Sequence, residues 1–489
     1  MLTLVLDQGG HSSRALVFNE YGKCVAKTQH PIKSKICPKT KHVESQPFDI
    51  LSSLKNCLHD LLQLGLPPID QAALICQRSN LIACNKLTLQ PITPIISWQD
   101  VRHANYLEQQ INDNSLNIEQ FHSVTGLRPN AHLGLSKIQW LLRFDASVRY
   151  HHDNHTLIFM PASAWLSAQL CYRPLDNIIC DPSCAQRLGL LNIHTGQWSQ
   201  ALLKAAGIDA TCLPELVDSC YEWGHLLGAI PLNLVGGDQS FIPYIAEETT
   251  RQNSFFVNLG SGAFILSDAE KNILNNRRSS QLYSVSQLSA QEGVFLEATV
   301  NSAANAINTY YNAYMKVSYS TLADAIEQAV NTQHAKIPLY LNASNGLAAP
   351  FWDARLRSMF CYPAPPSKAA LLEFKAVIES VIFLITINLE IFNSVKPLKS
   401  QIIVSGGLSQ SGAMMQLLAD VTGLLVLVSA ETEASSKGAA NVLLITHNTL
   451  EYKGAYRPQE NQSAFCLKQR LKQFKQLMIK YTTPTSNNV

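Results

Sequence analysis

The segment from Asp7 to Arg14, Asp-Gln-Gly-Gly-His-Ser-Ser-Arg, places an acid, two glycines, two hydroxyls and an arginine within one short stretch. A turn of this composition can present backbone N–H groups and the Ser12 hydroxyl to a phosphate, while Arg14 adds positive charge. Asp7 follows an apolar run and is suited to hold Mg²⁺. The competing interpretation is an ordinary hairpin whose glycines only allow a positive φ.

A second turn, Asn-Leu-Gly-Ser-Gly-Ala at 258–263, repeats this chemistry in the other half of the sequence. Gly260 and Gly262 carry no side chains that would obstruct the close approach of a phosphate to the backbone. A plain hairpin competes here as well. Two similar turns at similar places in two halves nevertheless favour a pair of phosphate-binding loops that face each other.

Three further motifs follow apolar runs or begin expected helices. The segment 405–411, Ser-Gly-Gly-Leu-Ser-Gln-Ser, can bring the backbone close to a nucleotide, although it lacks the lysine of a P-loop. Asp238, in Gly-Gly-Asp-Gln, ends an apolar run and could accept the proton of an attacking hydroxyl, whereas a surface acid would do no chemistry. The small residues of 435–440 are interpreted as a tightly packed helix start.

The spacing of apolar residues predicts the elements that must position these motifs. Strands in a meander are expected at 3–7, 14–18 and 24–29, with 7–13 containing the loop, and the pattern returns at 254–260, 263–267 and 294–298. Other strand-like runs lie at 72–77, 94–98, 401–404 and 424–429, and helical patterns at 49–64, 136–144 and 368–392. This alternation indicates an α/β protein of two related domains, 1–243 and 244–489.

The composition excludes several classes of protein. The chain has 489 residues, 46% hydrophobic and 15% charged, which fits an enzyme with large cores. A net charge of +2 gives no general attraction to nucleic acids or membrane surfaces. No apolar run reaches the roughly 18 residues of a membrane span, and the N-terminus lacks a secretory-signal pattern. We expect a cytoplasmic protein without nucleic-acid or membrane partners, its 12 cysteines reduced.

Taken in order, the motifs resemble those of a known family. The segments DQGGHSSR, CQRSNL, SWQDVR, TGLRPNAHLGLSK, GGDQ, NLGSGAF, APFWD, SGG and SKGAA are similar in sequence and spacing to the FGGY carbohydrate kinases, most closely the glycerol kinase branch. The resemblance runs from residue 3 to about 445. It implies an α/β fold of two actin-like (ribonuclease-H-like) domains with an active-site cleft between them. The first domain would carry the substrate and catalytic base, and the second the nucleotide.

The resemblance also implies residue roles in the transfer of phosphate from ATP, with Mg²⁺, to a hydroxyl of a small polyol or sugar. Asp238 matches the catalytic base, and Asp7 matches the acid near the magnesium-bound phosphates. The positions that match nucleotide contacts are Gly10, His11, Ser12, Arg14, Ser261, Gly262, Ala304, Asn308, Gly407 and Ser411. Those that match substrate contacts are Arg78, Ser79, Trp98, His132, Asp238 and Gln239.

Four nucleotide positions differ from the glycerol kinase pattern. Gly10 and His11 stand where that branch has two threonines, Ser261 replaces a threonine, and Ser411 replaces an asparagine. We expect these changes to alter the contacts with ATP without removing them.

Two substrate positions differ as well: Ser79 replaces a glutamate and His132 a tyrosine. A small triol is held by a few directed hydrogen bonds, and exchange of a carboxylate for a hydroxyl removes two strong acceptors and leaves space. A longer polyol or a ketose would fill that space, with His132 as a donor or acceptor that responds near neutral pH. In the alternative interpretation His132 only packs or caps.

Three functions stay open from the sequence. The first is a glycerol-kinase-like enzyme, with a kinase for another polyol or a ketopentose as its close alternative. The second is a catalytically degenerate sugar- or nucleotide-binding regulator, which the changed threonines suggest and the two aspartates argue against. The third is an actin-like or chaperone-like ATPase that uses partner proteins, which would not need Arg78 or Trp98. For the kinase, the resemblance makes a homo-oligomer reasonable.

Overall fold

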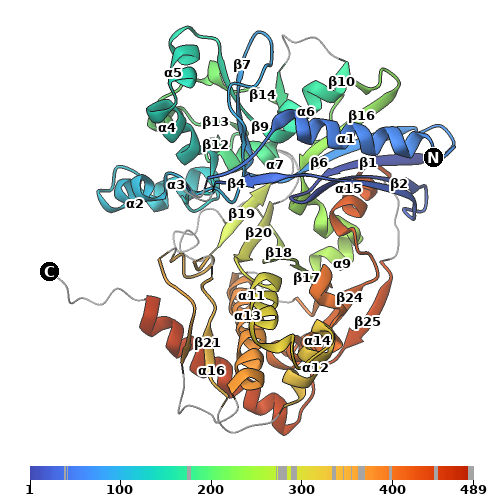
Figure 1. Cartoon of the computed structure of the whole chain (residues 1–489), viewed down its shortest axis with the longest axis vertical. Helices are drawn as coiled ribbons and strands as arrows, with labels where there is room; N and C mark the ends of the chain where they lie inside the picture. Colours follow the sequence, from blue (N-terminus) through green and yellow to red (C-terminus); the bar gives the residue numbers. More distant parts are fainter. Residues whose placement is uncertain are drawn as a thin grey trace.

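Two seven-stranded sheets, one in each half of the chain, organise the protein (Figure 1). The computed structural model describes residues 1–37, 40, 42–172, 178–270, 273, 283–287, 294–332, 337–344, 346–353, 355–361, 369–395, 399–444 and 450–482. Among these residues, no helix is both long and apolar enough to cross a membrane.

The first sheet has the order β10-β15-β16-β6-β1-β2-β3. Its strands are β1 (Leu2–Gln8), β2 (Ser12–Asn19), β3 (Cys24–Pro31), β6 (Gln71–Cys76), β10 (Cys171–Tyr172), β15 (His225–Leu226) and β16 (Ile230–Gly237). β1 is antiparallel to β2 and parallel to β6, which is parallel to β16. Because parallel strands end at the same edge, the ends of β1, β6 and β16 carry Asp7, Arg78 and Asp238 to one side of the sheet.

The second sheet, β19-β20-β18-β17-β23-β24-β25, repeats this topology. Its strands are β17 (Ser254–Leu259), β18 (Ala263–Ala269), β19 (Ser284–Gln287), β20 (Val294–Val300), β23 (Gln401–Ser405), β24 (Leu425–Ser429) and β25 (Tyr452–Tyr456). β17 is antiparallel to β18 and parallel to β23, just as β1 is to β2 and β6. The predicted repeat of a strand meander in two halves is therefore confirmed.

The first glycine turn is tighter than the sequence predicted. We expected a loop over 7–13, but Asp7 pairs with Arg14 within the β1–β2 ladder, and Gln8 pairs with Ser13. The loop is reduced to Gly9, Gly10 and His11 because strand pairing satisfies the backbone groups on both sides.

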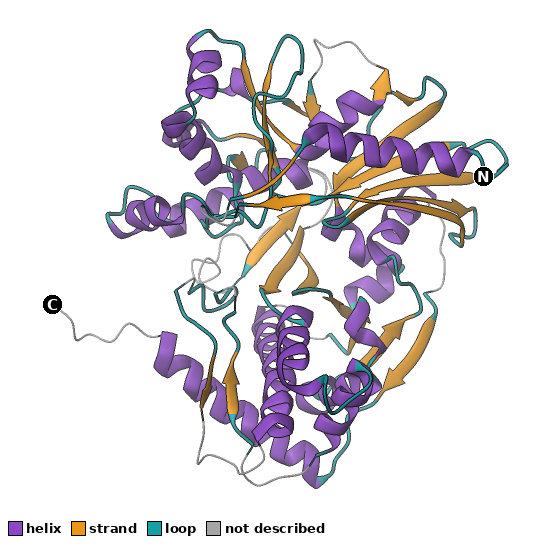
Figure 2. Cartoon of the chain, in the orientation of Figure 1, coloured by secondary structure: helices purple, strands orange, loops and turns teal. Residues whose placement is uncertain are grey.

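Helices cover the first sheet on both faces, as Figure 2 shows. α1 (Pro47–Leu62) begins with a proline in its first turn and buries a stripe at Ile50, Leu54, Cys57 and Leu61, the spacing of one helical face. It packs on β2 and β3, and α6 (Ala162–Leu170) packs on β6.

A helix from the far end of the sequence covers the other face of this sheet. α15 (Ala434–Leu444) packs against β1, β6 and the 3-10 helix η3 (Asp238–Ile245). A Cβ at Gly438 would lie 1.9 Å from the backbone oxygen of Phe241, so only glycine permits this approach. The tight packing predicted for 435–440 is confirmed, and it joins the two halves.

The remaining elements complete the two halves. In the first half the remaining α-helices are α2 (Ala104–Asn112), α3 (Ile118–Thr125), α4 (Gly134–Phe144), α5 (Ala146–Asp153), α7 (Pro182–Ala185) and α8 (Gln200–Ala206). The remaining strands form a five-stranded sheet of β4 (Ser34–Ile36), β5 (Val43–Ser45), β7 (Leu81–Asn85), β8 (Ile95–Ile96) and β9 (Leu157–Pro161), and two pairs, β11 (Ile179–Cys180) with β14 (Glu215–Leu216) and β12 (Leu191–Asn192) with β13 (Gln197–Trp198). In the second half the remaining elements are α9 (Glu248–Gln252), α11 (Ala304–Tyr310), α12 (Leu322–Asn331), α13 (Ala369–Val395), α14 (Gly412–Thr422), α16 (Gln462–Thr482), β21 (Leu339–Leu341) and β22 (Met359–Cys361).

Candidate functional site

The turn between β1 and β2 is held by its own backbone. The N–H of Gly9 donates to the carbonyl of Ser12 at 3.1 Å. A Cβ at Gly10 would lie 3.0 Å from Nε2 of Gln77, so the glycine keeps the turn close to β6. Ser12 is buried, whereas His11 is exposed.

Asp7 is a buried carboxylate with two side-chain partners. Nη1 of Arg14 lies 3.1 Å from its Oδ2, and the hydroxyl of Ser436 donates to the same oxygen at 3.3 Å. Burial raises the pKa of Asp7 to about 6, although the positive charge of Arg14 opposes this change. The ionised form is therefore poorly compensated, which suits a group that gains a cation.

Arg14 is shared between the two halves of the chain. Its Nη1 also lies 3.1 Å from Oε2 of Glu433, which precedes α15 and forms a second ion pair with Lys27. Nε of Arg14 is buried and has no hydrogen-bond partner among the described residues. The arginine predicted to contact phosphate is thus fixed in place by two carboxylates.

The second glycine turn joins β17 to β18 and supports the start of α11. The N–H of Gly260 donates to the carbonyl of Gly262 at 2.9 Å, and the N–H of Ala304 donates to the carbonyl of Gly260 at 3.1 Å. A Cβ at Gly262 would lie 2.7 Å from the carbonyl oxygen of Val300. Asn308 lies on the exposed side of α11, away from these backbone contacts.

The third glycine segment lies against the second. Gly406 has φ +90°, and a Cβ there would meet the carbonyl oxygen of Leu259 at 2.6 Å. Gly407, in contrast, has open space where a Cβ would project. Ser411 caps α14 by accepting a hydrogen bond from the N–H of Met414 at 3.4 Å. The structure thus brings two of the predicted nucleotide segments together.

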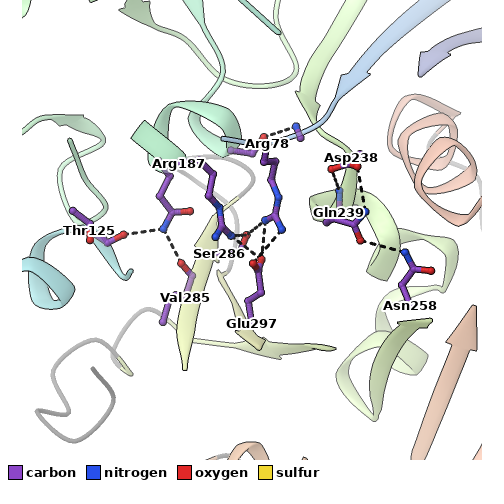
Figure 3. A network of polar contacts seen from close by, with 12 residues as sticks. Arg78, Thr125, Arg187, Asp238, Gln239, Asn258, Val285, Ser286 and Glu297 are labelled. Atoms are coloured by element: carbon purple, nitrogen blue, oxygen red, sulfur yellow. Dashed lines mark hydrogen bonds and ion pairs between the residues drawn. The ribbon is translucent and has the colours of Figure 1, made fainter. Parts of the chain in front are cut away.

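Asp238 stands where β16 ends and η3 begins, and it is partly buried. The N–H of Gln239 donates to its Oδ1 at 2.7 Å, and Nε2 of Gln239 to its Oδ2 at 3.2 Å. Nδ2 of Asn258 donates to Oε1 of Gln239 at 3.3 Å (Figure 3). Asp238 is thereby linked to the residue that begins the second glycine turn. Burial raises the pKa of Asp238, and the charge of Arg78 partly opposes this.

Arg78 makes an ion pair that sequence reasoning missed. Its Nη1 and Nη2 lie 2.7 and 3.1 Å from the two carboxylate oxygens of Glu297, on β20 of the other half (Figure 3). Nη2 of Arg187 lies 2.7 Å from the same carboxylate, and the hydroxyl of Ser286 accepts from both arginines. Burial raises the pKa of Glu297, but the two guanidiniums outweigh it and lower the value to about 2.

Ser79 and His132 are held by a buried lysine. Nζ of Lys137 donates to the carbonyl oxygens of Ser79, at 2.7 Å, and His132, at 2.9 Å. Ser79 has φ +64°, a conformation that is uncommon for serine and typical of functional sites. Burial lowers the pKa of Lys137 to about 7.

The imidazole of His132 has a defined orientation. Its Nδ1 lies 2.8 Å from the carbonyl oxygen of Trp98, so Nδ1 carries the proton and Nε2 is an acceptor in the neutral ring. Burial lowers the pKa of His132, which favours the neutral ring. The response of its charge near neutral pH, expected from the sequence, stays a prediction.

The residues that sequence reasoning missed share one property. They make contacts between distant parts of the chain: Glu297, Lys137 and Glu433 contact predicted site residues directly, and Arg187 contacts Glu297. Glu297 lies in an apolar run, Val-Phe-Leu-Glu-Ala, and a charge within a buried strand was the available signal.

Comparison with family models identifies both halves of the chain. Residues 2–233 match the N-terminal domain, and residues 256–446 the C-terminal domain, of the FGGY family of carbohydrate kinases. The chain belongs to this FGGY family. The resemblance noted in the sequence, including its two actin-like α/β domains, is confirmed.

Relatives of this FGGY kinase include glycerol kinases. The chain is 29% identical over 455 residues to a glycerol kinase of Polaromonas naphthalenivorans, covering 89% of each chain. Its fold is similar to that of ligand-bound xylulose kinase from Lactobacillus acidophilus, with a TM-score of 0.84, 17% identity and 99% coverage of both chains. Glycerol kinase from Plasmodium falciparum, solved with ADP, gives a TM-score of 0.84 at 18% identity and the same coverage.

As an FGGY carbohydrate kinase, the protein is a phosphotransferase that uses ATP with Mg²⁺ to phosphorylate a hydroxyl of a small polyol or sugar. The residues present fit these groups. Beside the first turn, three buried polar atoms have no hydrogen-bond partner within the described part of the chain: Oε1 of Gln8, Oγ of Ser13 and Nε of Arg14. Magnesium at kinase sites takes one or two carboxylates and completes its ligand set with phosphates and water, so Asp7 and its surroundings are sufficient.

Proposed function

We propose that Asp238 is the catalytic base and that the acceptor lies beside it, in contact with Arg78, Ser79, Trp98, His132 and Gln239. One observation carries this proposal: Asp238 directly follows β16, next to Arg78, and is hydrogen-bonded through Gln239 to Asn258, which begins the second glycine turn. These contacts support a base close to a phosphate loop, as transfer to a hydroxyl requires.

The chemistry assigned to the protein is positioning and proton acceptance. A carboxylate oxygen of Asp238 takes the proton of the acceptor hydroxyl, and its raised pKa makes it a better base than an ordinary aspartate. Backbone N–H groups of the two glycine turns and the guanidinium of Arg14 orient the phosphates. Asp7 would hold Mg²⁺, which supplies positive charge to the phosphates when bound. Gly407 leaves room for the nucleotide, with Ser411, Ala304 and Asn308 as further contacts.

Glycerol or a similar polyol is the leading acceptor, since the curated relatives are glycerol kinases. A longer polyol or ketopentose is the second candidate. Ser79, with its short side chain and positive φ, offers no carboxylate to a small triol, and neutral His132 offers one acceptor at Nε2.

The test is an ADP-release assay with Mg-ATP and a panel of glycerol, C4 to C6 polyols, D-xylulose and D-gluconate. Asp238→Asn should lower acceptor-dependent turnover about 100-fold or more, because it removes the base. Asp209→Asn, which changes an exposed acid at the start of a short helix, is the matched control and should retain turnover. Wild-type turnover in Asp238→Asn would refute the assignment. ATP binding without turnover on any acceptor would favour a regulatory protein.

We also propose that the domain boundary lies near residue 243, as expected from the sequence. The first sheet ends at Gly237 and the second begins at Ser254, which supports a boundary in the intervening segment. The homo-oligomer and the cytoplasmic location stay predictions, and light scattering of the purified protein would test the first.

A further inference from the structure

Glu297 is a buried carboxylate that joins the two domains at the proposed acceptor site. It belongs to β20 of the C-terminal domain, and its two arginine partners belong to the N-terminal domain. Only 4% of the residue is exposed. Two guanidiniums around one carboxylate leave the cluster with one excess positive charge. Figure 3 shows this cluster and Asp238 in the same region of the structure.

The contacts of Arg78 fix both ends of its side chain. A Cβ at Gly237 would lie 2.4 Å from Cγ of Arg78, so the stem passes directly over the backbone that precedes Asp238. At the far end, Glu297 and Ser286 accept three of the five N–H donors of the guanidinium. The donors outside these bonds, the Nε–H and one Nη2–H, are held in a fixed direction.

β20 also connects Glu297 to the second glycine turn. Glu297 pairs with Leu266 of β18, and Val300, three residues further on, pairs with Ala263 at the end of that turn. The carbonyl of Val300 is the atom that a Cβ at Gly262 would meet. One short strand therefore contacts both the arginine of the acceptor site and the loop of the phosphate site.

We propose that Glu297 is a positioning residue for the acceptor: its carboxylate, supplied by the nucleotide-binding domain, orients the guanidinium of Arg78 toward the acceptor only when the two domains are together. This inference rests on the proposed acceptor site. It gives the C-terminal domain a direct part in acceptor affinity, in addition to its part in nucleotide binding.

A purely structural ion pair is the competing explanation, since loss of one partner of a buried pair destabilises any protein. The two explanations differ in the neighbourhood of Asp238. The negative charge of Glu297 and the positive charge of Arg78 both act on that carboxylate, with opposite effects on its pKa. Loss of the charge of Glu297 is therefore expected to lower the pKa of Asp238, whereas loss of a buried carboxylate far from Asp238 is not.

The experiment compares Glu297→Gln with the matched control Glu379→Gln. Glu379 is also a buried carboxylate paired with an arginine, but Glu379 on α13 and Arg470 on α16 both belong to the C-terminal domain. Glu297→Gln should raise the KM for the best acceptor of the panel at least about tenfold with a smaller effect on kcat. The acid limb of its pH profile of kcat/KM should move to lower pH, because loss of the negative charge lowers the pKa of Asp238. Glu379→Gln should show neither change.

A conservative variant separates charge from geometry. Glu297→Asp keeps the charge, so its acid limb should stay near that of the wild type while the shorter side chain still raises KM. Circular dichroism and thermal melting establish that each variant is folded. A wild-type KM and acid limb in folded Glu297→Gln, or the same changes in Glu379→Gln, would overturn the proposal.

Calorimetric binding separates this inference from the proposed function. Glycerol, xylitol and D-xylulose are titrated into the wild type and Glu297→Gln in the presence of Mg-ADP. Binding to the wild type without turnover would contradict the proposed function, while about tenfold weaker binding to Glu297→Gln would still support the role of Glu297. Equal binding to both would refute that role, and no binding to the wild type would refute both.

Discussion

At the scale of single residues, the buried Asp7 and the partly buried Asp238 both have raised pKa values. Burial raises the pKa of both Asp7 and Asp238, and the negative charge of Asp238 raises the pKa of Asp7 further. A pKa of about 6 for Asp7 means that a substantial fraction of the free protein carries a proton there near pH 6. A bound cation would favour the ionised form instead.

We therefore predict proton release when Mg-ATP binds near pH 6. Because the pKa of Asp7 is raised in the free protein, binding that requires the anion must expel the proton; well above pH 6 little proton remains to be released. Calorimetry in two buffers of different ionisation enthalpy measures the number of protons. The Asp7→Asn variant should release fewer protons, because the proton held by Asp7 is absent. Unchanged proton release in that variant would contradict the assignment of Asp7 as the magnesium-binding acid.

At the scale of elements, glycines decide how closely the loops approach one another. Gly406 must be glycine because its φ is positive and Leu259 lies against it. Gly407, one residue later, meets nothing within 4 Å. The two adjacent glycines are thus required for different reasons. Gly406 allows the ends of β23 and β17 to come together, and Gly407 leaves room for a ligand.

Gly407→Ala should weaken nucleotide binding without harming the fold. The added methyl group projects into open space in the free protein, but it would meet a nucleotide lying on this segment. We expect the KM for ATP to rise about tenfold or more, with little change in acceptor KM or Tm. Steady-state kinetics and thermal melting check this.

Gly406→Ala provides the contrast for this experiment. Its Cβ would collide with backbone, so its Tm should fall. An unchanged KM for ATP in Gly407→Ala would show that the nucleotide lies elsewhere.

At the scale of the whole molecule, the two domains are joined by contacts on two sides of the site. α15 packs on β1 and on η3, and Glu433 before it holds Arg14 and Lys27 of the N-terminal domain. Glu297 holds Arg78 and Arg187. The proposed site residues of the two domains are thus kept together by packing on one side and by ion pairs on the other.

Gly438→Ala should disrupt the packed side. Its Cβ would lie 1.9 Å from a backbone oxygen of η3, so α15 must shift away from the helix that begins with Asp238. We expect a loss of stability of about 3 kcal/mol and a fall in turnover. Thermal melting measures the first effect, with Gly407→Ala as a control that should keep its Tm. A wild-type Tm in Gly438→Ala would show that α15 can move at no cost.

Much of this organisation follows from the sequence alone. Local alternation and apolar runs determine β1, β2, β17 and β18, and the same residues place Asp7 and Asp238 at strand ends, because a buried strand is a local pattern. The order of nine motifs was sufficient to indicate the family. The exact end of each strand was not predictable, as the loop over 7–13 shows, because pairing with a neighbouring strand decides it.

Only the tertiary structure decided which charges meet. Arg78 and Glu297 are 219 residues apart, and Arg14 and Glu433 are 419 apart, so no local spacing could connect them. Lys137 was visible as a helical lysine, but its contacts with the backbone of Ser79 and His132 exist only because α4 packs beside that turn. The spacing of apolar residues is a local property of the sequence, so it can be recognised without the structure. Ion pairs between the domains depend on how the two sheets come together.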